Sequence, residues 1–147
     1  MNFYSIFKKD TKPAESLNFI KISDHKRHLV KLRLGNHTLR IETGRHTIPR
    51  TPEHQRLCKY CEQNKIENEQ HFMLDCDLYE NERKKLFEKI NNKFPHFTQL
   101  NDTLKIMFLF NSIDPTVSKS TAAFINHAIN TRKTNYISNH IQNSNCQ

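Results

Sequence analysis

Four residues of the chain have the types and the spacing that bind a metal ion. Cys58, Cys61, His71 and Cys76 follow the pattern C-x2-C-x9-H-x4-C, which includes three of the four cysteines. Two cysteines separated by two residues form a tight turn whose thiolates bind one side of a metal ion, and a nearby His and Cys complete the other side. Zinc takes four such ligands in a closed structural site. The pattern therefore predicts one structural Zn²⁺ ion.

Other interpretations of the cysteines stay open at this point. The chain has nine histidines, so a His can lie near a cysteine by chance. A C-x2-C pair can also be redox-active, but such pairs follow a strand, and no apolar strand precedes Cys58. His54 is an alternative ligand, and we expect Cys146 to take no part. With no signal peptide and no 20-residue apolar stretch visible, we expect reduced thiols in an intracellular protein, nuclear or cytoplasmic, without a membrane span.

A helix and a loop are expected on the N-terminal side of the pattern. Asp24 suits the cap of a helix over residues 25–34, and Gly35 suits the left-handed position that ends it. The apolar side of this helix is predicted to consist of Leu29, Val30 and Leu34. Residues 38–41 suggest a short extended stretch, and a glycine and two prolines break regular structure over residues 44–52.

A short helix is expected around His71. Asn68 suits its cap, and residues 69–74 follow. On an unbroken α-helix His71 and Cys76 would point about 140° apart, so the helix must end at or before Cys76 if both bind one ion. The second ring nitrogen of a metal-binding His is usually hydrogen-bonded. The predicted acceptors for this nitrogen are Glu67, Asp75 or a backbone carbonyl.

Helices are also predicted for the remainder of the chain. Asp77 and Glu80 resemble a capping box, which opens a helix over residues 78–91. Two more helices are expected, over residues 101–110 and, after the cap and first-turn proline at Asp114 and Pro115, up to residue 141. Phe72 and the apolar residues of these helices are the candidate core.

The predicted fold class is mainly α. It is a small helical domain in which a Cys-Cys-His-Cys zinc knuckle joins a basic helix and loop to a helical hairpin, followed by two further helices. Hydrophobic residues make up only 35% of the chain, so a metal ion would help to stabilise a small core. The predicted parts are a flexible segment (1–23), the zinc-binding module (24–93), a C-terminal helical region (94–141) and a disordered tail (142–147).

Basic residues are concentrated before and within the first cysteine pair. Residues 21–65 contain eleven Lys or Arg and four Asp or Glu, whereas residues 66–89 contain four basic and seven acidic residues, and the net charge is +8. This pattern predicts a surface that binds the phosphates of RNA or DNA, although a solvated surface with internal ion pairs has the same composition. The candidate contacts are Lys26, Arg27, Lys31, Arg33, Arg40, Arg45 and Arg50. The candidates for base stacking are Tyr60 and Phe72.

Several segments together resemble a known module: residues 32–37, 41–45, 56–61, 66–72 and 76–79, with Arg83. Over residues 24–86 the chain is similar to the zinc-binding region at the C-terminal end of reverse transcriptases from LINE-type (non-LTR) retrotransposons. This resemblance implies a zinc-stabilised module that binds RNA or DNA, with the ligands Cys58, Cys61, His71 and Cys76. The sequence has no paired-aspartate polymerase motif, so we expect neither polymerase nor endonuclease in it.

Nucleic-acid binding has three alternatives. An enzyme is not expected, because four protein ligands leave the metal no open position and the chain has no phosphate-binding glycine loop. A protein-binding or self-associating domain would present an apolar helical face made of Leu104, Met107, Phe108, Phe110, Phe124 and Ile125. A translated remnant of a mobile element would also fit the polar composition, which includes sixteen asparagines.

Overall fold

The computed structural model describes the backbone of residues 15–144 and the side chains of residues 15–135. In this part the protein is mainly helical and has no β-strand, which confirms the predicted fold class. None of the described helices is long and apolar enough to cross a membrane. The elements in chain order are η1 (Glu15–Phe19), α2 (Ser23–Arg33), α3 (Arg40–Thr43), η2 (Glu53–Gln55), η3 (His71–Asp75), η4 (Asp77–Tyr79), α4 (Glu80–Asn91), η5 (Phe97–Gln99), α5 (Asp102–Asn111) and α6 (Pro115–Ser144).

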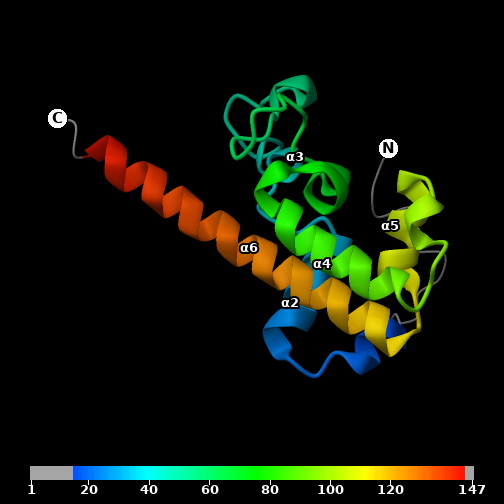
Figure 1. Cartoon of the computed structure of the whole chain (residues 1–147). Helices are drawn as coiled ribbons and strands as arrows, with labels where there is room; N and C mark the ends of the chain where they lie inside the picture. Colours follow the sequence, from blue (N-terminus) through cyan, green and yellow to red (C-terminus); the bar gives the residue numbers. More distant parts are fainter. Residues whose placement is uncertain (1–14, 145–147) are drawn as a thin grey trace.

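The long helix α6 is the element on which the others assemble. It packs against η1, α2, α4 and α5, and Figure 1 shows it running through the molecule, with its C-terminal part extending past the other helices. One hydrophobic core joins all these helices, with members such as Leu32, Phe72, Ile90 and Ile125 at most 1% exposed. The predicted zinc-binding module and C-terminal helical region therefore share one core.

Helix α2 begins at Ser23, two residues earlier than predicted, and ends at Arg33, with Gly35 in the left-handed position expected for it. The predicted Asp24 cap is wrong, because Asp24 lies inside the helix and the N-cap residue is Ile22, without a side-chain cap hydrogen bond. Gly35 has φ = +68°, and the backbone N–H groups of Gly35 and Asn36 donate to the carbonyls of Leu32 and Lys31. These two bonds form the Schellman arrangement that favours glycine after a helix. The predicted apolar face was partly wrong: the buried residues are His28, Leu29 and Leu32. Leu34 lies beyond the last helical residue and is 53% exposed.

Three predicted irregular segments contain structure. Glu15–Phe19 forms the 3₁₀-helix η1 against α6, so the flexible segment predicted for residues 1–23 is wrong from Glu15 onward. The extended stretch predicted over residues 38–41 is wrong from Arg40 onward, because α3 begins there, whereas Leu39 has extended dihedral angles. Helix α6 continues to Ser144, which includes the first part of the tail predicted over residues 142–147. Residues 1–14 and 145–147, with Cys146, lie outside the described residues.

The helix starts were predicted with mixed success. Asp77 and Glu80 form no capping box: the Asp77 carboxylate accepts a hydrogen bond from the Gln63 amide (2.6 Å), and the 3₁₀-helix η4 precedes α4. The cap at α6 is confirmed, since the Asp114 carboxylate accepts bonds from the backbone N–H groups of Thr116 (2.9 Å) and Val117 (3.2 Å).

The apolar helical face predicted for a protein partner is largely internal. Phe110, Phe124 and Ile125 are buried in the core, and the Phe108 ring packs against those of Phe94 and Phe97. Of the six residues only Leu104 is strongly exposed, at 46%. Most of the surface that this alternative needs is therefore not available in the monomer.

The loop between α3 and the first cysteine is built around a buried arginine. Arg56 is 2% exposed, and its guanidinium donates to the carbonyl oxygen of Ile41 (2.7 Å) and twice to that of Thr51 (2.9 and 2.8 Å). Gly44 lies directly against this side chain. A Cβ atom at position 44 would lie 2.8 Å from Cγ, Cδ and Nε of Arg56.

We expect Gly44→Ala to lower the free energy of unfolding by about 1–3 kcal/mol, because the new methyl group displaces an anchored side chain from a packed site. Urea denaturation measures the change. In an Arg56→Ala background the clashing atoms are absent, so the same substitution is expected to cost much less there. An equal cost in both backgrounds would contradict the assigned cause.

Candidate metal centre

The four predicted ligands lie together in space. The Sγ atoms of Cys58, Cys61 and Cys76 and a ring nitrogen of His71 all lie within 4.8 Å of one another. The Sγ atoms of Cys58 and Cys76 are 3.9 Å apart, and Cys61 Sγ lies 3.3 Å from His71 Nε2. Tetrahedral zinc, with Zn–S near 2.3 Å and Zn–N near 2.0 Å, would place its ligand atoms about 3.5–3.8 Å apart. This Cys₃His group could hold a metal ion.

A short hairpin presents the first two cysteines. The backbone N–H of Cys58 donates to the Lys65 carbonyl, and that of Glu67 donates to the Arg56 carbonyl, both at 2.8 Å. These bonds flank the antiparallel bridge between Leu57 and Ile66. The Tyr60 N–H donates to Cys58 Sγ at 3.4 Å, which stabilises negative charge on that sulfur. The hairpin thus directs the C-x2-C turn toward the second pair of ligands.

A π-helical turn brings His71 and Cys76 to the same site. The predicted Asn68 cap is confirmed, since its side chain accepts a bond from the His71 N–H at 2.8 Å. In η3 the Cys76 N–H donates to the His71 carbonyl five residues earlier, also at 2.8 Å. On an α-helix His71 and Cys76 would point in different directions. This wider turn places both on the same side of the backbone. The helix ends before Cys76, as predicted.

A buried arginine fixes the end of this turn. Arg83 of α4 is 7% exposed, and its guanidinium donates to the carbonyl oxygens of Met73 (3.1 Å) and Cys76. Burial lowers the pKa of this guanidinium, and the negative groups around it oppose that effect. The carbonyl groups of Met73, within η3, and of Cys76, just after it, therefore have a charged donor although they lie away from water.

The thiols of the group have unequal acidity. A hydrogen bond from the Cys76 thiol lowers the pKa of Cys58 to about 3. The same bond, with burial, raises the pKa of Cys76, and burial raises the pKa of Cys61. Metal ligation requires all three thiols to be deprotonated. A bound divalent cation would offset the charge of three neighbouring thiolates, which explains why such a group suits a metal ion.

The prediction that the second ring nitrogen of His71 is hydrogen-bonded is wrong. Nδ1 is buried and has no hydrogen-bond partner among the described residues. The Asp75 carboxylate pairs with Lys65 (3.4 Å), and Glu67 is bound elsewhere. Nε2 is the nitrogen on the side of the sulfurs, which leaves Nδ1 as the remaining ring donor. His54, the alternative ligand, is exposed and lies outside the group.

A buried ion pair connects the ligand hairpin to α6. Arg132 donates through Nε and Nη2 to the two carboxylate oxygens of Glu67, at 3.0 and 2.9 Å. Their side chains are 13% and 3% exposed. Glu67 also accepts a bond from the Arg40 backbone N–H at 2.8 Å. The pair joins residues 65 positions apart in the sequence, and sequence reasoning gave no signal for it.

The two aromatic candidates for base stacking have internal partners. The Tyr60 ring lies 4.7 Å from the guanidinium carbon of Arg132, and so part of it covers the buried ion pair. Phe72 is 1% exposed and packs against the rings of Tyr79 and Phe124. Phe72 is therefore a core residue.

The seven predicted phosphate contacts divide into three groups. Arg33 points inward and donates to the Phe110 carbonyl at 2.5 Å, and burial lowers the pKa of its guanidinium. Two residues form exposed ion pairs: Arg27 with Asp24 (2.9 Å) and Arg45 with Glu42 (3.1 Å). The others are the half-buried Lys26 and Arg40 and the exposed Lys31 and Arg50, which have no ion pair among the described residues.

No family model, curated protein or solved structure matches the chain. What the protein does must therefore be inferred from its own residues. The geometry of the Cys₃His group and the distribution of basic side chains are the two observations that bear on it.

Proposed function

We propose that the chain is a zinc-stabilised nucleic-acid-binding module, related to the reverse transcriptases of non-LTR retrotransposons and acting without polymerase or endonuclease activity. The observation that carries the proposal is the largely buried Cys₃His group, whose four ligand atoms lie within 4.8 Å of one another. Three sulfurs and one imidazole at this spacing favour Zn²⁺ over the cations that prefer oxygen. The similarity of residues 24–86 to the zinc-binding region of those enzymes supports the same assignment.

The metal ion has a structural role in this proposal. Four protein ligands leave no position for a water molecule or a substrate, which catalytic zinc needs. Cys58, His71 and Cys76 are at most 8% exposed, so solvent has little access to the ion. When bound, the zinc would link the hairpin around Cys58 to η3 and supply a large part of the folding free energy of this region.

The charge of the chain supports phosphates as the ligand. The net charge is +8, and several basic side chains are exposed. The exposed ion pairs of Arg27 and Arg45 contribute little to stability, so these arginines can exchange a carboxylate for a phosphate at small cost. Lys31 and Arg50 add two more charges that no described carboxylate neutralises.

Binding to a single-stranded oligonucleotide is expected to weaken steeply with salt. Each phosphate contact contributes about 0.7 to the slope of log K against log salt, so three contacts lower the affinity roughly 20-fold between 50 and 200 mM salt. Fluorescence anisotropy with a labelled 20-nucleotide strand measures this. A peptide nucleic acid of the same sequence has no phosphates and is the matched control. Equal affinity for both strands, or no dependence on salt, would contradict the proposal.

A further inference from the structure

A groove runs along the side of α6 that faces α4 and the start of α2. It consists of two adjoining hollows with volumes of about 420 and 370 Å³. Both are lined by His25, Lys89, Ser120 and Ala123, so they form one continuous depression. Volumes in this range are typical of ligand sites. None of the seven basic residues that the sequence predicted as phosphate contacts lines it.

The groove carries a surplus of positive charge. Lys21, Lys89 and Lys119 line it, and none of them has an ion pair among the described residues. Among the described residues, the only carboxylate in its walls is that of Glu82, which pairs with Lys85 at 2.8 Å. In the part of the chain that the structure describes, the walls therefore have three lysines without an ion pair and no free carboxylate, which is complementary to a ligand with several negative charges.

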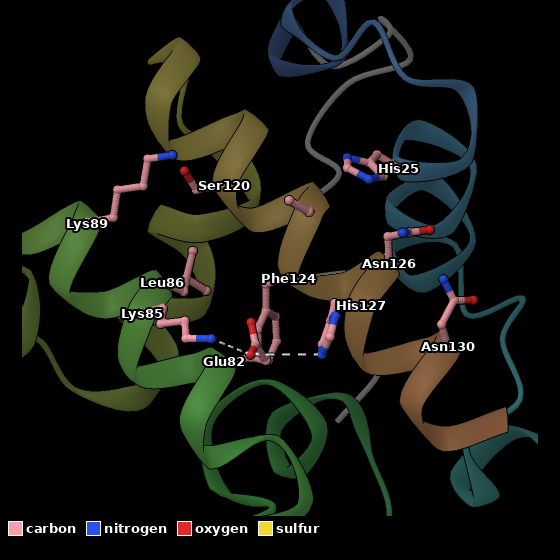
Figure 2. A pocket seen from close by; sticks show the side chains of 11 residues that line it. His25, Glu82, Lys85, Leu86, Lys89, Ser120, Phe124, Asn126, His127 and Asn130 are labelled. Carbon is pink, nitrogen blue, oxygen red and sulfur yellow. Dashed lines mark hydrogen bonds and ion pairs between the residues drawn. The ribbon is translucent and has the colours of Figure 1, made fainter. Parts of the chain in front are cut away.

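Figure 2 shows how these side chains are arranged in one of the hollows. Lys89 extends from α4 toward Ser120 of α6, and His25 approaches from α2 on the other side. Glu82, Lys85 and His127 form a separate group lower in the groove, where His127 lies 3.9 Å from Glu82. The positive end of the groove is thus the end near Lys89.

The same end of the groove has apolar surface. Phe19, Ile20 and Ile22 line the smaller hollow, and Ile22 is 57% exposed. Proteins that bind single strands combine a positively charged groove with aromatic side chains on which bases stack, and Phe19 supplies one such ring here. A free inorganic anion would leave this apolar surface uncovered, and an uncharged apolar ligand would leave the three lysines without a counter-charge.

We propose that a single strand of RNA or DNA lies in this groove, with its phosphates at Lys21, Lys89 and Lys119 and a base against Phe19 and Ile22. The inference rests on the proposed nucleic-acid-binding function and moves the phosphate contacts to a face that the sequence did not indicate. A strand fits better than a mononucleotide because the depression continues over both hollows, from η1 along α4.

The test is a titration of the zinc-loaded chain with a labelled single-stranded oligonucleotide at several salt concentrations. The double variant Lys89→Ala/Lys119→Ala loses two phosphate contacts, so the slope of log K against log salt is expected to fall by about 1.4. With equal affinities of parent and variant at 1 M salt, this difference in slope lowers the affinity of the variant at 50 mM salt roughly 60-fold. Lys105→Ala/Lys133→Ala removes the same charge outside the groove and is expected to change the affinity far less. Lys89→Arg/Lys119→Arg keeps the charge and is expected to retain binding.

Each other outcome overturns the inference in a distinguishable way. If both alanine pairs weaken binding equally, the proposed function stands and the groove is not its site. If the parent chain binds no oligonucleotide, both the proposed function and the groove assignment fail. If adenosine monophosphate binds with the affinity of the oligonucleotide and the groove variant abolishes both, the ligand is a small phosphorylated molecule and not a strand.

Discussion

The Cys76→Ser variant is expected to lose its bound zinc and its cooperative fold. Cys76 is 1% exposed, and its Sγ lies 3.9 Å from that of Cys58, so a serine hydroxyl would replace one of the four ligand atoms at the centre of the site. Structural zinc contributes about 10–16 kcal/mol in small zinc-binding peptides, which equals or exceeds the whole stability of a typical domain. Elemental analysis and thermal unfolding followed by circular dichroism measure the two losses.

The remaining cysteine supplies the matched control. Cys146→Ser removes a thiol near the C-terminus, outside the described residues, and is expected to keep both the metal content and the unfolding transition of the parent. A Cys76→Ser protein with the zinc content and midpoint of the parent would show that the group is not a structural metal site.

The Arg132→Met variant is expected to be the most destabilised of the variants that keep the metal ligands. It leaves the Glu67 carboxylate, 3% exposed, without its bidentate partner. Breaking a buried ion pair by removing one partner costs about 3–5 kcal/mol, because a buried charge is left uncompensated. Burial lowers the pKa of Arg132, but the hydrogen bonds and charge of Glu67 outweigh it, so the arginine stays charged in the parent. Urea denaturation gives the change in the free energy of unfolding.

A double-mutant cycle separates the ion pair from the packing of Arg132. In Glu67→Gln/Arg132→Met no charge is left buried, so this protein is expected to recover part of the lost stability. Lys133→Met alters the neighbouring exposed residue of α6 and is expected to stay within about 0.5 kcal/mol of the parent. The cycle also needs Glu67→Gln alone. If the double variant loses the sum of the stabilities lost in Glu67→Gln and Arg132→Met, the two side chains are not coupled.

Features that depend on local sequence were predictable. The Asn68 and Asp114 caps and the glycine after α2 each require only residues a few positions apart, and the metal-ligand pattern lies within residues 58–76; the structure contains all of them. The requirement that one ion binds both His71 and Cys76 also predicted correctly where the short helix must end. Neither helix propensity nor hydrophobic periodicity predicted that the turn formed by η3 is π-helical.

Features that depend on the tertiary fold were not predictable. Arg33, Arg56, Arg83 and Arg132 bind backbone carbonyls or a buried carboxylate, and composition alone cannot distinguish them from arginines that bind phosphates. The face of α2 was misplaced because α6 selects which side is covered. Likewise, the groove along α6 unites residues from η1, α2, α4 and α6, whose proximity exists only once the helices have packed.

The central claim is that the Cys₃His group holds one zinc ion. X-ray absorption at the zinc edge, together with elemental analysis of the purified parent chain, tests it most directly. The account predicts one zinc per chain, with three sulfur neighbours near 2.3 Å and one nitrogen neighbour near 2.0–2.1 Å. A folded protein without zinc, or a zinc ion surrounded by oxygen and nitrogen alone, would contradict it.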